Sequence, residues 1–344
     1  MPRNVPSPHC LATGVGALPH ADPTAACNLV LSIFPKFPFI PTLPNRGVFE
    51  QIVFNDSENL PGRTIIDQRL TVDTTVDYAP EVEKIYQDYL EGNYVPYAAG
   101  KNYASAFHEM MKFRLSNTLV LKCQITGPVT FGMQVTDCER RPIFYNPQFA
   151  DVLGKLIGLR ARWFEEEMHQ KTGVTETLIV LNEPYLSSLG SLVVPVDPDM
   201  ARSAIVDSSA LLTGGYGIHC CANTDWEFLL EMQPAVLSID AYTTAKEFLL
   251  YGSSIGSFLE KGGIVAWGIV PAEYQVFSKE SCSSLFQRFE GIKKQVCEYV
   301  SPHIFSAQSL ITPTCGLRFT NEKEAAEIMQ LTALLSHKIR RTFL

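Results

Sequence analysis

Tyr216-Gly-Ile-His-Cys-Cys-Ala-Asn-Thr224 has the pattern of a short apolar strand that runs into a polar turn. Alternate side chains of a strand share a face, so His219 and Cys221 point together and Cys220 points to the opposite face. Imidazole and thiolate are both ligands that zinc favours. Buried histidines and free cysteines without a metal are also common in protein cores, so the pair by itself leaves both interpretations open.

A third candidate ligand favours the metal interpretation. Cys315 follows another apolar stretch, Leu310-Ile-Thr-Pro-Thr-Cys-Gly316, far along the chain. Its setting at the end of an apolar stretch matches that of His219 and Cys221. The sequence therefore predicts a zinc site built from segments that are distant along the chain.

Apolar or β-branched runs that end in Gly, Pro or polar residues recur along the chain, and amphipathic stretches separate most of them. Eight runs are predicted as strands: Cys10–Ala17, Phe37–Leu43, Leu119–Thr126, Thr177–Leu181, Tyr216–Cys221, Ala235–Asp240, Gly263–Val270 and Ala307–Ile311. The predicted helices begin near Asp22 or cover Glu81–Glu91, Asn146–Thr172, Ser281–Val300 and Glu322–Arg341. Eight strand-then-helix units with near-continuous apolar strands predict an α/β chain folded as a (β/α)8 TIM barrel, a single domain over residues 1–344.

Residues 44–100 fit the repeating pattern least well and are predicted as an elaborated insertion or loop. Within them, Thr64–Val76 has the pattern of a hairpin arm. On the long helix Asn146–Thr172, the polar side is expected to carry Arg160, Arg162, Glu165 and Glu166.

The composition argues against several classes of partner. The formal net charge is −8 and no Lys/Arg-rich run with interleaved aromatics occurs, which argues against nucleic acid. No segment approaches the roughly 18 apolar residues of a membrane span, and the N-terminus lacks the apolar core of a signal peptide, so we expect a cytoplasmic protein with no membrane partner. Nine cysteines at irregular spacing fit reduced thiols and a metal site better than a disulfide framework.

Active sites of (β/α)8 barrels lie at the C-terminal ends of the strands. Asp240 ends a predicted strand, as His219, Cys221 and Cys315 do, and its carboxylate is a candidate fourth and displaceable ligand. Other strand ends carry Gly14-Val-Gly16, Thr126-Gly-Pro128 and Asn182-Glu183. Two thiolates make a zinc site electron-rich, which suits deprotonation of a substrate thiol better than formation of hydroxide. Because the thiolate is the nucleophilic form of sulfur, these residues predict alkyl transfer to sulfur.

Five motifs carry a resemblance to a known family. They are Thr126-Gly-Pro-Val-Thr130, Asn182-Glu-Pro184, His219-Cys-Cys221, Ser238-Ile-Asp240 and Cys315-Gly-Leu-Arg318. In this order they resemble the C-terminal barrel of cobalamin-independent methionine synthase, in the superfamily that also holds uroporphyrinogen decarboxylase and the methylcobalamin:coenzyme M methyltransferases. The resemblance implies zinc, bound by His219, Cys221 and Cys315, that activates homocysteine, with Asp240 at the position of the family's glutamate. It also implies substrate contacts from Val15, Gly16, Ala17, Asn182 and Glu183.

Departures from the family pattern bear on the methyl donor. The full-length family enzyme has a second barrel and binds methyl-folate at the joint, whereas this chain has room for one barrel. A family histidine that assists protonation of the folate is missing from Gly268-Ile-Val-Pro271, where Ile269 or Val270 takes its place. A folate leaving group needs that proton, and cob(I)alamin does not. We therefore expect methylcobalamin, free or carried on a corrinoid protein, as the donor.

The thiol acceptor is predicted as homocysteine, with coenzyme M or another small thiol as the alternative. Where the family has a serine and an aspartate that hold the amino acid end of homocysteine, this chain has Ala17 and Asn182. Asn182 accepts a hydrogen bond but lacks the charge that pairs with an ammonium, and Glu183 is a candidate for supplying that carboxylate. Two further hypotheses stay open: a metal-free enzyme similar to uroporphyrinogen decarboxylase, and a zinc-bearing accessory barrel without catalysis.

Overall fold

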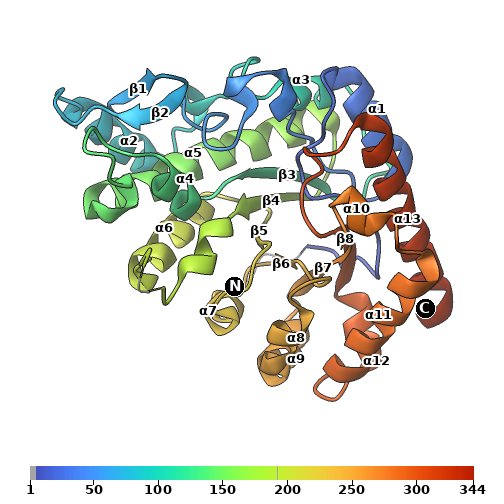
Figure 1. Cartoon of the computed structure of the whole chain (residues 1–344). Helices are drawn as coiled ribbons and strands as arrows, with labels where there is room; N and C mark the ends of the chain where they lie inside the picture. Colours follow the sequence, from blue (N-terminus) through green and yellow to red (C-terminus); the bar gives the residue numbers. More distant parts are fainter. Residues whose placement is uncertain (1–4, 192) are drawn as a thin grey trace.

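Six parallel strands form one curled sheet in the order β3-β4-β5-β6-β7-β8 in the computed structural model, which describes residues 5–191 and 193–344 (Figure 1). The strands are β3 (Leu121–Thr126), β4 (Thr177–Asn182), β5 (Gly215–Cys220), β6 (Val236–Ile239), β7 (Ile264–Val270) and β8 (Ser309–Pro313). They are buried along nearly their whole length because helices cover one face of the sheet and side chains fill the other. The predicted α/β class with a parallel sheet is confirmed.

Two segments join the free edges of this sheet, and they are the two that the sequence predicts as the first strands. Ala12 forms an isolated parallel bridge with β8, and Phe39 forms one with β3. A third isolated bridge joins the two segments to each other. Over the described residues both segments contribute bridges rather than strands, so six of the eight predicted strands are confirmed. We call residues 10–17 and 37–43 together the seam.

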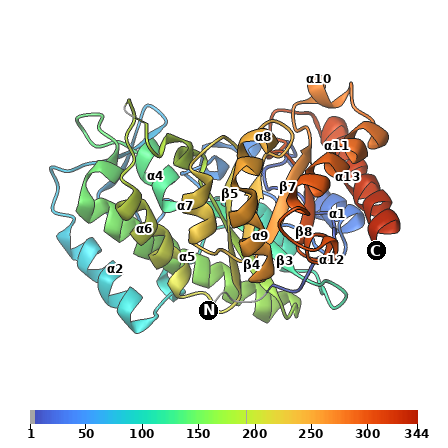
Figure 2. The ribbon, with the colours of Figure 1, turned by 90° about the horizontal axis from the view of Figure 1, so that it is seen from below.

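Helices cover the outer side of the sheet (Figures 1 and 2). The α-helices are α1 (Pro23–Ile33), α2 (Ala79–Glu91), α3 (Ser105–Met110), α4 (Pro128–Gln134), α5 (Pro147–Thr172), α6 (Pro198–Ala210), α7 (Trp226–Glu231), α8 (Ala245–Phe248), α9 (Gly252–Glu260), α10 (Tyr274–Phe277), α11 (Cys282–Val296), α12 (Pro302–Ala307) and α13 (Glu322–Phe343). Short 3-10 helices cover Pro44–Arg46, Val48–Glu50, Val95–Tyr97, Ile143–Tyr145, Pro184–Ser188 and Leu249–Tyr251. Within the described parts of the chain, no helix has the length and apolar character that crossing a membrane requires.

Local sequence signals explain where the longest helix begins and ends. The side chain of Asn146 accepts a hydrogen bond from the backbone N–H of Gln148, and Pro147 occupies the first helical position. Gly173 follows the helix with a φ of 75°, a left-handed conformation that glycine adopts without strain. The predicted bounds of α5 are therefore confirmed by its caps.

Alternate strand positions fill the interior of the curled sheet. Its apolar layer consists of Val5, Phe37, Val120, Leu178, Val180, Ala235, Val236, Ile264, Ala266 and Leu310. Gly215 makes room for Val5, because a Cβ at position 215 would lie 2.3 Å from Cγ2 of Val5. This layer fills the interior near the N-terminal ends of the strands, so the inward-facing polar residues gather at the C-terminal ends.

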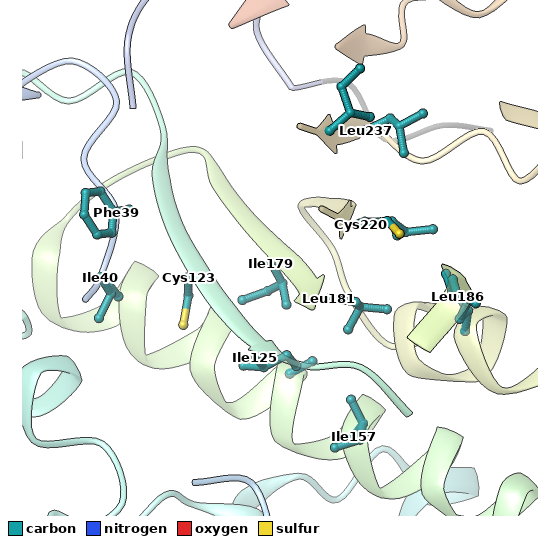
Figure 3. Packing of buried hydrophobic residues seen from close by; sticks show 14 of the residues in the cluster. Phe39, Ile40, Cys123, Ile125, Ile157, Ile179, Leu181, Leu186, Cys220 and Leu237 are labelled. Carbon is teal, nitrogen blue, oxygen red and sulfur yellow. The ribbon is translucent and has the colours of Figure 1, made fainter. Parts of the chain in front are cut away.

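The opposite faces of the strands pack against the helices. Figure 3 shows Ile125, Ile179 and Leu181 on the side of the sheet that faces α5, where Ile157 lies. Cys220 is fully buried in the same outer cluster, as its predicted orientation away from the metal ligands requires.

The region predicted as an insertion contains a small sheet of its own. Thr64–Val76 is not a single hairpin arm but holds most of a complete antiparallel hairpin, formed by β1 (Arg63–Ile66) and β2 (Arg69–Val72). The two residues between the strands, Asp67 and Gln68, have φ values of 49° and 60°, which closes a two-residue turn.

The expected polar side of α5 needs correction at two positions. Arg160 and Glu165 are fully buried, because α5 packs against α2 and α6 as well as against the sheet. Arg160 donates to the carboxylate of Glu58 at 3.1 and 3.2 Å. Glu165 accepts hydrogen bonds from the backbone N–H groups of Thr213 at 2.8 Å and Gly214 at 2.6 Å. Both charges are buried with partners that compensate them.

Candidate metal centre

Three side chains with metal-binding atoms meet at the C-terminal end of the sheet. His219 lies near the end of β5, Cys221 directly follows β5, and Cys315 lies just after β8. One ligand atom from each side chain, the imidazole nitrogen and the two sulfurs, lies within 4.8 Å of the others. The structure thus brings together the three residues that the sequence predicts as ligands.

The imidazole of His219 is held in an orientation that suits a metal ligand. Its Nδ1 lies 2.9 Å from Oγ of Ser238 on the neighbouring strand β6. Its Nε2 is buried and has no hydrogen-bond partner in residues 5–191 and 193–344. A buried nitrogen without a partner is costly unless it binds something, and when Nδ1–H donates to the Ser238 hydroxyl the Nε2 lone pair is free for a metal. One nitrogen and two sulfurs therefore fit a zinc ion.

The two thiols influence each other's protonation. The S–H of Cys221 is hydrogen-bonded to the sulfur of Cys315, which holds the pKa of Cys315 well below its usual range. The same hydrogen bond, together with burial, raises the pKa of Cys221. An anionic sulfur beside a second sulfur is an environment that favours a bound cation.

Asp240, the predicted fourth ligand, directly follows β6 and lies outside this cluster. Its Oδ1 accepts hydrogen bonds from the backbone N–H groups of Tyr242 at 3.0 Å and Thr243 at 2.9 Å. Its Oδ2 accepts from the hydroxyl of Thr243 at 2.6 Å, and burial raises the pKa of the carboxyl. Both oxygens serve the turn after β6, so ligation by Asp240 requires that these bonds break.

A cavity of about 740 Å³ opens beside the three ligands, which form part of its wall. This volume lies within the range of small-molecule sites. Four of the predicted substrate-contact residues also line it: Val15, Gly16, Ala17 and Asn182. Exposed Arg318 and Phe319 belong to the wall as well. Four of the predicted substrate residues and three of the predicted ligands therefore share one cavity.

Glu183 is fully buried and is not part of the cavity wall. Its carboxylate accepts hydrogen bonds from the backbone N–H groups of Val129 at 3.0 Å and Thr130 at 2.7 Å, and from the hydroxyl of Thr130 at 2.7 Å. Burial raises the pKa of this carboxyl to about 7. In this structure Glu183 fixes the start of α4 against the end of β4.

Sequence reasoning missed a polar row on the inner face of β3. Lys122, Gln124 and Thr126 alternate with the outward-facing Cys123 and Ile125, and all are buried. Lys122 donates hydrogen bonds to backbone carbonyls of the seam, and Gln124 donates to Asn182. The sequence signal for this row is Lys122, a lysine inside an otherwise largely apolar strand.

The fold of this chain is similar to that of a solved structure. No protein-family profile and no curated protein matches the chain. A Listeria monocytogenes protein assigned as a vitamin-B12-independent methionine synthase is 14% identical, with a TM-score of 0.57 over 92% of this chain and 85% of that chain. A B12-independent methionine synthase from Shewanella sp. W3-18-1, solved with selenomethionine, is 14% identical with a TM-score of 0.47. That match covers 64% of this chain and 62% of that chain, less than two thirds of its length. The structural neighbours of this chain are thus cobalamin-independent methionine synthase-like proteins, and with the Listeria protein it shares the fold.

Proposed function

We propose that this chain is a zinc-dependent methyltransferase of the methionine synthase type, which transfers a methyl group to the sulfur of a small thiol. Homocysteine, which would give methionine, is the reference acceptor because of the family resemblance. Methylcobalamin or a methyl-corrinoid protein is the proposed donor, in preference to methyl-folate.

The observation that carries the proposal is the unpartnered Nε2 of His219, which faces two sulfurs in the wall of a cavity. When bound there, zinc supplies a positive charge that lowers the pKa of a substrate thiol, so that the nucleophilic thiolate exists at neutral pH. The protein's own residues orient the reactants. Ser238 holds the imidazole of His219, and the cavity wall positions the substrate beside it.

The reaction is a displacement at carbon. The thiol proton leaves to solvent, the substrate sulfur attacks the methyl carbon in line, and a new C–S bond forms. The bond from that carbon to the donor breaks, and its electron pair stays on the donor, which for methylcobalamin gives cob(I)alamin. The products are a thioether and the demethylated donor, so atoms and charges balance.

The residues at the end of β7 support a donor that needs no proton. Ile269 and Val270 are fully buried, and neither offers an acid. Of the described residues that line the cavity, His219 alone is a histidine, and it serves as a ligand in this proposal. A cavity of about 740 Å³ also suits a thiol and the face of a corrin at its mouth better than a fully enclosed cobalamin.

We further propose that the seam supplies the first two strand positions of a (β/α)8 barrel over residues 1–344. The isolated bridges run from β8 through the seam to β3, in the order that closure of a barrel needs. In this proposal residues 44–100 are an insertion after the second strand position. Asp240 stays a candidate for the fourth ligand, and Glu183 for a substrate contact, only after rearrangement of their present hydrogen bonds.

Purified protein should be offered homocysteine with methylcobalamin or methyl-folate in parallel, and its metal content measured on the same sample. We expect bound zinc, and methionine from methylcobalamin only. Cys315→Ser should lose both the zinc and the activity, whereas the exposed Cys138→Ser is the matched control that keeps both. Zinc without methyl transfer to any small thiol would contradict the proposal, and a protein that binds no zinc would favour the metal-free decarboxylase alternative.

A further inference from the structure

Lys122 is a buried cation whose hydrogen bonds are fully accounted for. Its Nζ donates to the backbone carbonyl of Gly14, to that of Val15 at 3.0 Å, and to Oε1 of Gln124 at 3.1 Å. An ammonium has three N–H donors and no acceptor. Three acceptors around it therefore match the protonated form, and each of them must present an oxygen.

This requirement fixes the amide of Gln124. Because Oε1 faces the ammonium, Nε2 must face the other way, and there it donates to Oδ1 of Asn182. Gln124 also packs against Gly16, where a Cβ would lie 3.4 Å from Oε1, so the amide is confined on that side. The orientation follows from the chemistry of lysine.

The hydrogen bonds from Lys122 to Gln124 and from Gln124 to Asn182 form a chain that we call the relay. It ends at Asn182, at the C-terminal end of β4. Its Oδ1 is occupied by Gln124, so its Nδ2 is the atom left for the cavity that the residue lines. No group in the described part of the chain accepts a hydrogen bond from this Nδ2. Asn182 thus offers the cavity a hydrogen-bond donor and no charge.

The backbone carbonyls of residues 14–17, which lie beside this wall, are already occupied. The carbonyls of Gly14 and Val15 face Lys122, and those of Gly16 and Ala17 accept from the backbone N–H groups of Thr42 and Leu317. Exposed Glu273 also belongs to the cavity wall, but it follows β7, which lies three strands from β4 in the sheet order. The cavity also contains a buried carboxylate, that of Glu50. One of its oxygens is paired with Arg46 at 3.1 Å and the other accepts from a backbone N–H at 3.2 Å.

We propose that Asn182, oriented by Lys122 through Gln124, selects a thiol whose far end is a hydrogen-bond acceptor, a carboxylate or a sulfonate, and disfavours a thiol with an ammonium there. This rests on the proposed thiol methyl transfer and names its substrate class. Homocysteine then becomes a poorer acceptor than the same molecule without its amino group. Lys122 and Gln124 are positioning residues, and Asn182 is the residue that touches the substrate.

The test compares homocysteine with 4-mercaptobutanoate, which differs from it only by the missing amino group. Dissociation constants for zinc-loaded protein are measured by calorimetry at about pH 6, below the value of about 7 to which burial lowers the pKa of Lys122. We expect 4-mercaptobutanoate to bind about tenfold or more tightly, since homocysteine presents the same carboxylate to Asn182 but must also bury an ammonium beside a fixed donor. A third arm, 2-mercaptoethanesulfonate, separates a sulfonate from a carboxylate as the preferred acid.

Two variants make the comparison specific. Asn182→Asp places a carboxylate at the end of the relay and should shift the ratio of the two dissociation constants about tenfold or more toward homocysteine. Gln124→Glu should shift it in the same direction, because a carboxylate held by Lys122 accepts from Asn182 and turns Oδ1 to the cavity. A merely structural role for Gln124 would change both affinities equally and leave their ratio alone.

The inference is overturned if wild-type protein prefers homocysteine, if neither thiol binds, or if the ratio is unchanged in both variants. Methyl transfer is scored separately. A protein that shows the expected binding ratio but transfers no methyl group would contradict the proposed function and leave the selectivity of the cavity established.

Discussion

Nδ1 of His219 lies 2.9 Å from Oγ of Ser238, the residue whose Cα is its direct partner across β5 and β6. The pairing is fixed by the register of two buried strands, so the imidazole is oriented before any metal arrives. A serine that holds the second nitrogen of a metal-binding histidine is a common supporting contact, and its loss typically weakens metal binding about 10- to 100-fold.

Ser238→Ala should therefore raise the zinc dissociation constant about 10- to 100-fold while the fold is retained. Competition with a chromogenic chelator measures this affinity, and circular dichroism checks the fold. The exposed Ser203→Ala serves as the control. Equal zinc affinities in the wild type and Ser238→Ala would mean that His219 needs no such support.

Zinc should protect Cys221 and Cys315 from alkylation. Both sulfurs belong to the cluster, so a bound ion would occupy their lone pairs. Iodoacetamide labelling followed by peptide mass spectrometry should show at least about tenfold slower modification of these two residues with zinc than after chelation. The exposed Cys138 should react at the same rate in both samples. If zinc does not slow the labelling of Cys315, this residue is not a zinc ligand.

Asp240→Asn should bind zinc with an affinity within about threefold of the wild type, because its carboxylate is committed to the turn and lies outside the cluster. Asparagine can still accept the backbone hydrogen bonds at Oδ1, so the loss of stability should be on the order of 1 kcal/mol. A much larger drop in zinc affinity would instead identify Asp240 as the fourth ligand.

Lys122 should make stability depend on pH. Burial lowers its pKa from 10.5 to about 7, so between these values the unfolded chain binds more protons than the folded one. The free energy of unfolding contributed by this group therefore rises as pH increases through that window, and below it the penalty of burying the ammonium is fully present. The free energy of unfolding of the wild type minus that of Lys122→Met should rise by on the order of 2 kcal/mol between about pH 7 and pH 9.

Urea unfolding at several pH values measures that difference. The exposed Lys279→Met is the matched control, and its difference from the wild type should stay flat. A flat difference for Lys122→Met as well would show that the buried lysine keeps its ordinary pKa.

Glu183→Ala should destabilise the fold by about 2–4 kcal/mol, since it leaves two backbone N–H groups at the start of α4 buried without acceptors. Gly127→Ala should act on the same contact, because its Cβ would lie 2.2 Å from Oε1 of Glu183. Urea unfolding measures both, with exposed Glu290→Ala as the control. If Glu183→Ala keeps the stability of the wild type but binds the thiol more weakly, Glu183 contacts the substrate instead.

The sequence predicts that the side chains of His219, Cys221 and Cys315 meet, because each part of the argument is local. Alternation along β5 separates His219 and Cys221 from Cys220, and parallel strands bring their C-terminal ends to one edge. The relay through Lys122 could not be predicted in this way. Its acceptors Gly14 and Val15 lie 108 and 107 positions away in the sequence, and only the curled sheet brings them together.

Burial on α5 shows a second limit of sequence patterns. Charged residues at helical spacing indicate a solvent-facing side only when the helix has one. Arg160 and Glu165 lie on a helix that is covered on several sides, and their partners come from a loop before the hairpin and from the turn before β5. The complete hairpin within residues 44–100 was not predicted, because its pairing depends on the two-residue turn at Asp67 and Gln68.

The seam gives the molecule an uneven resistance to local opening. Each neighbouring pair among β3 to β8 is joined by a ladder of several residue pairs, with one irregularity between Gly268 and Val270, whereas the seam is joined by isolated bridges. Amide hydrogens in residues 10–17 and 37–43 are therefore expected to exchange with solvent sooner than those of the six strands. Because residues 15–17 also line the cavity, the least protected backbone of the sheet lies against the proposed substrate site, and a bound thiol should slow its hydrogen exchange.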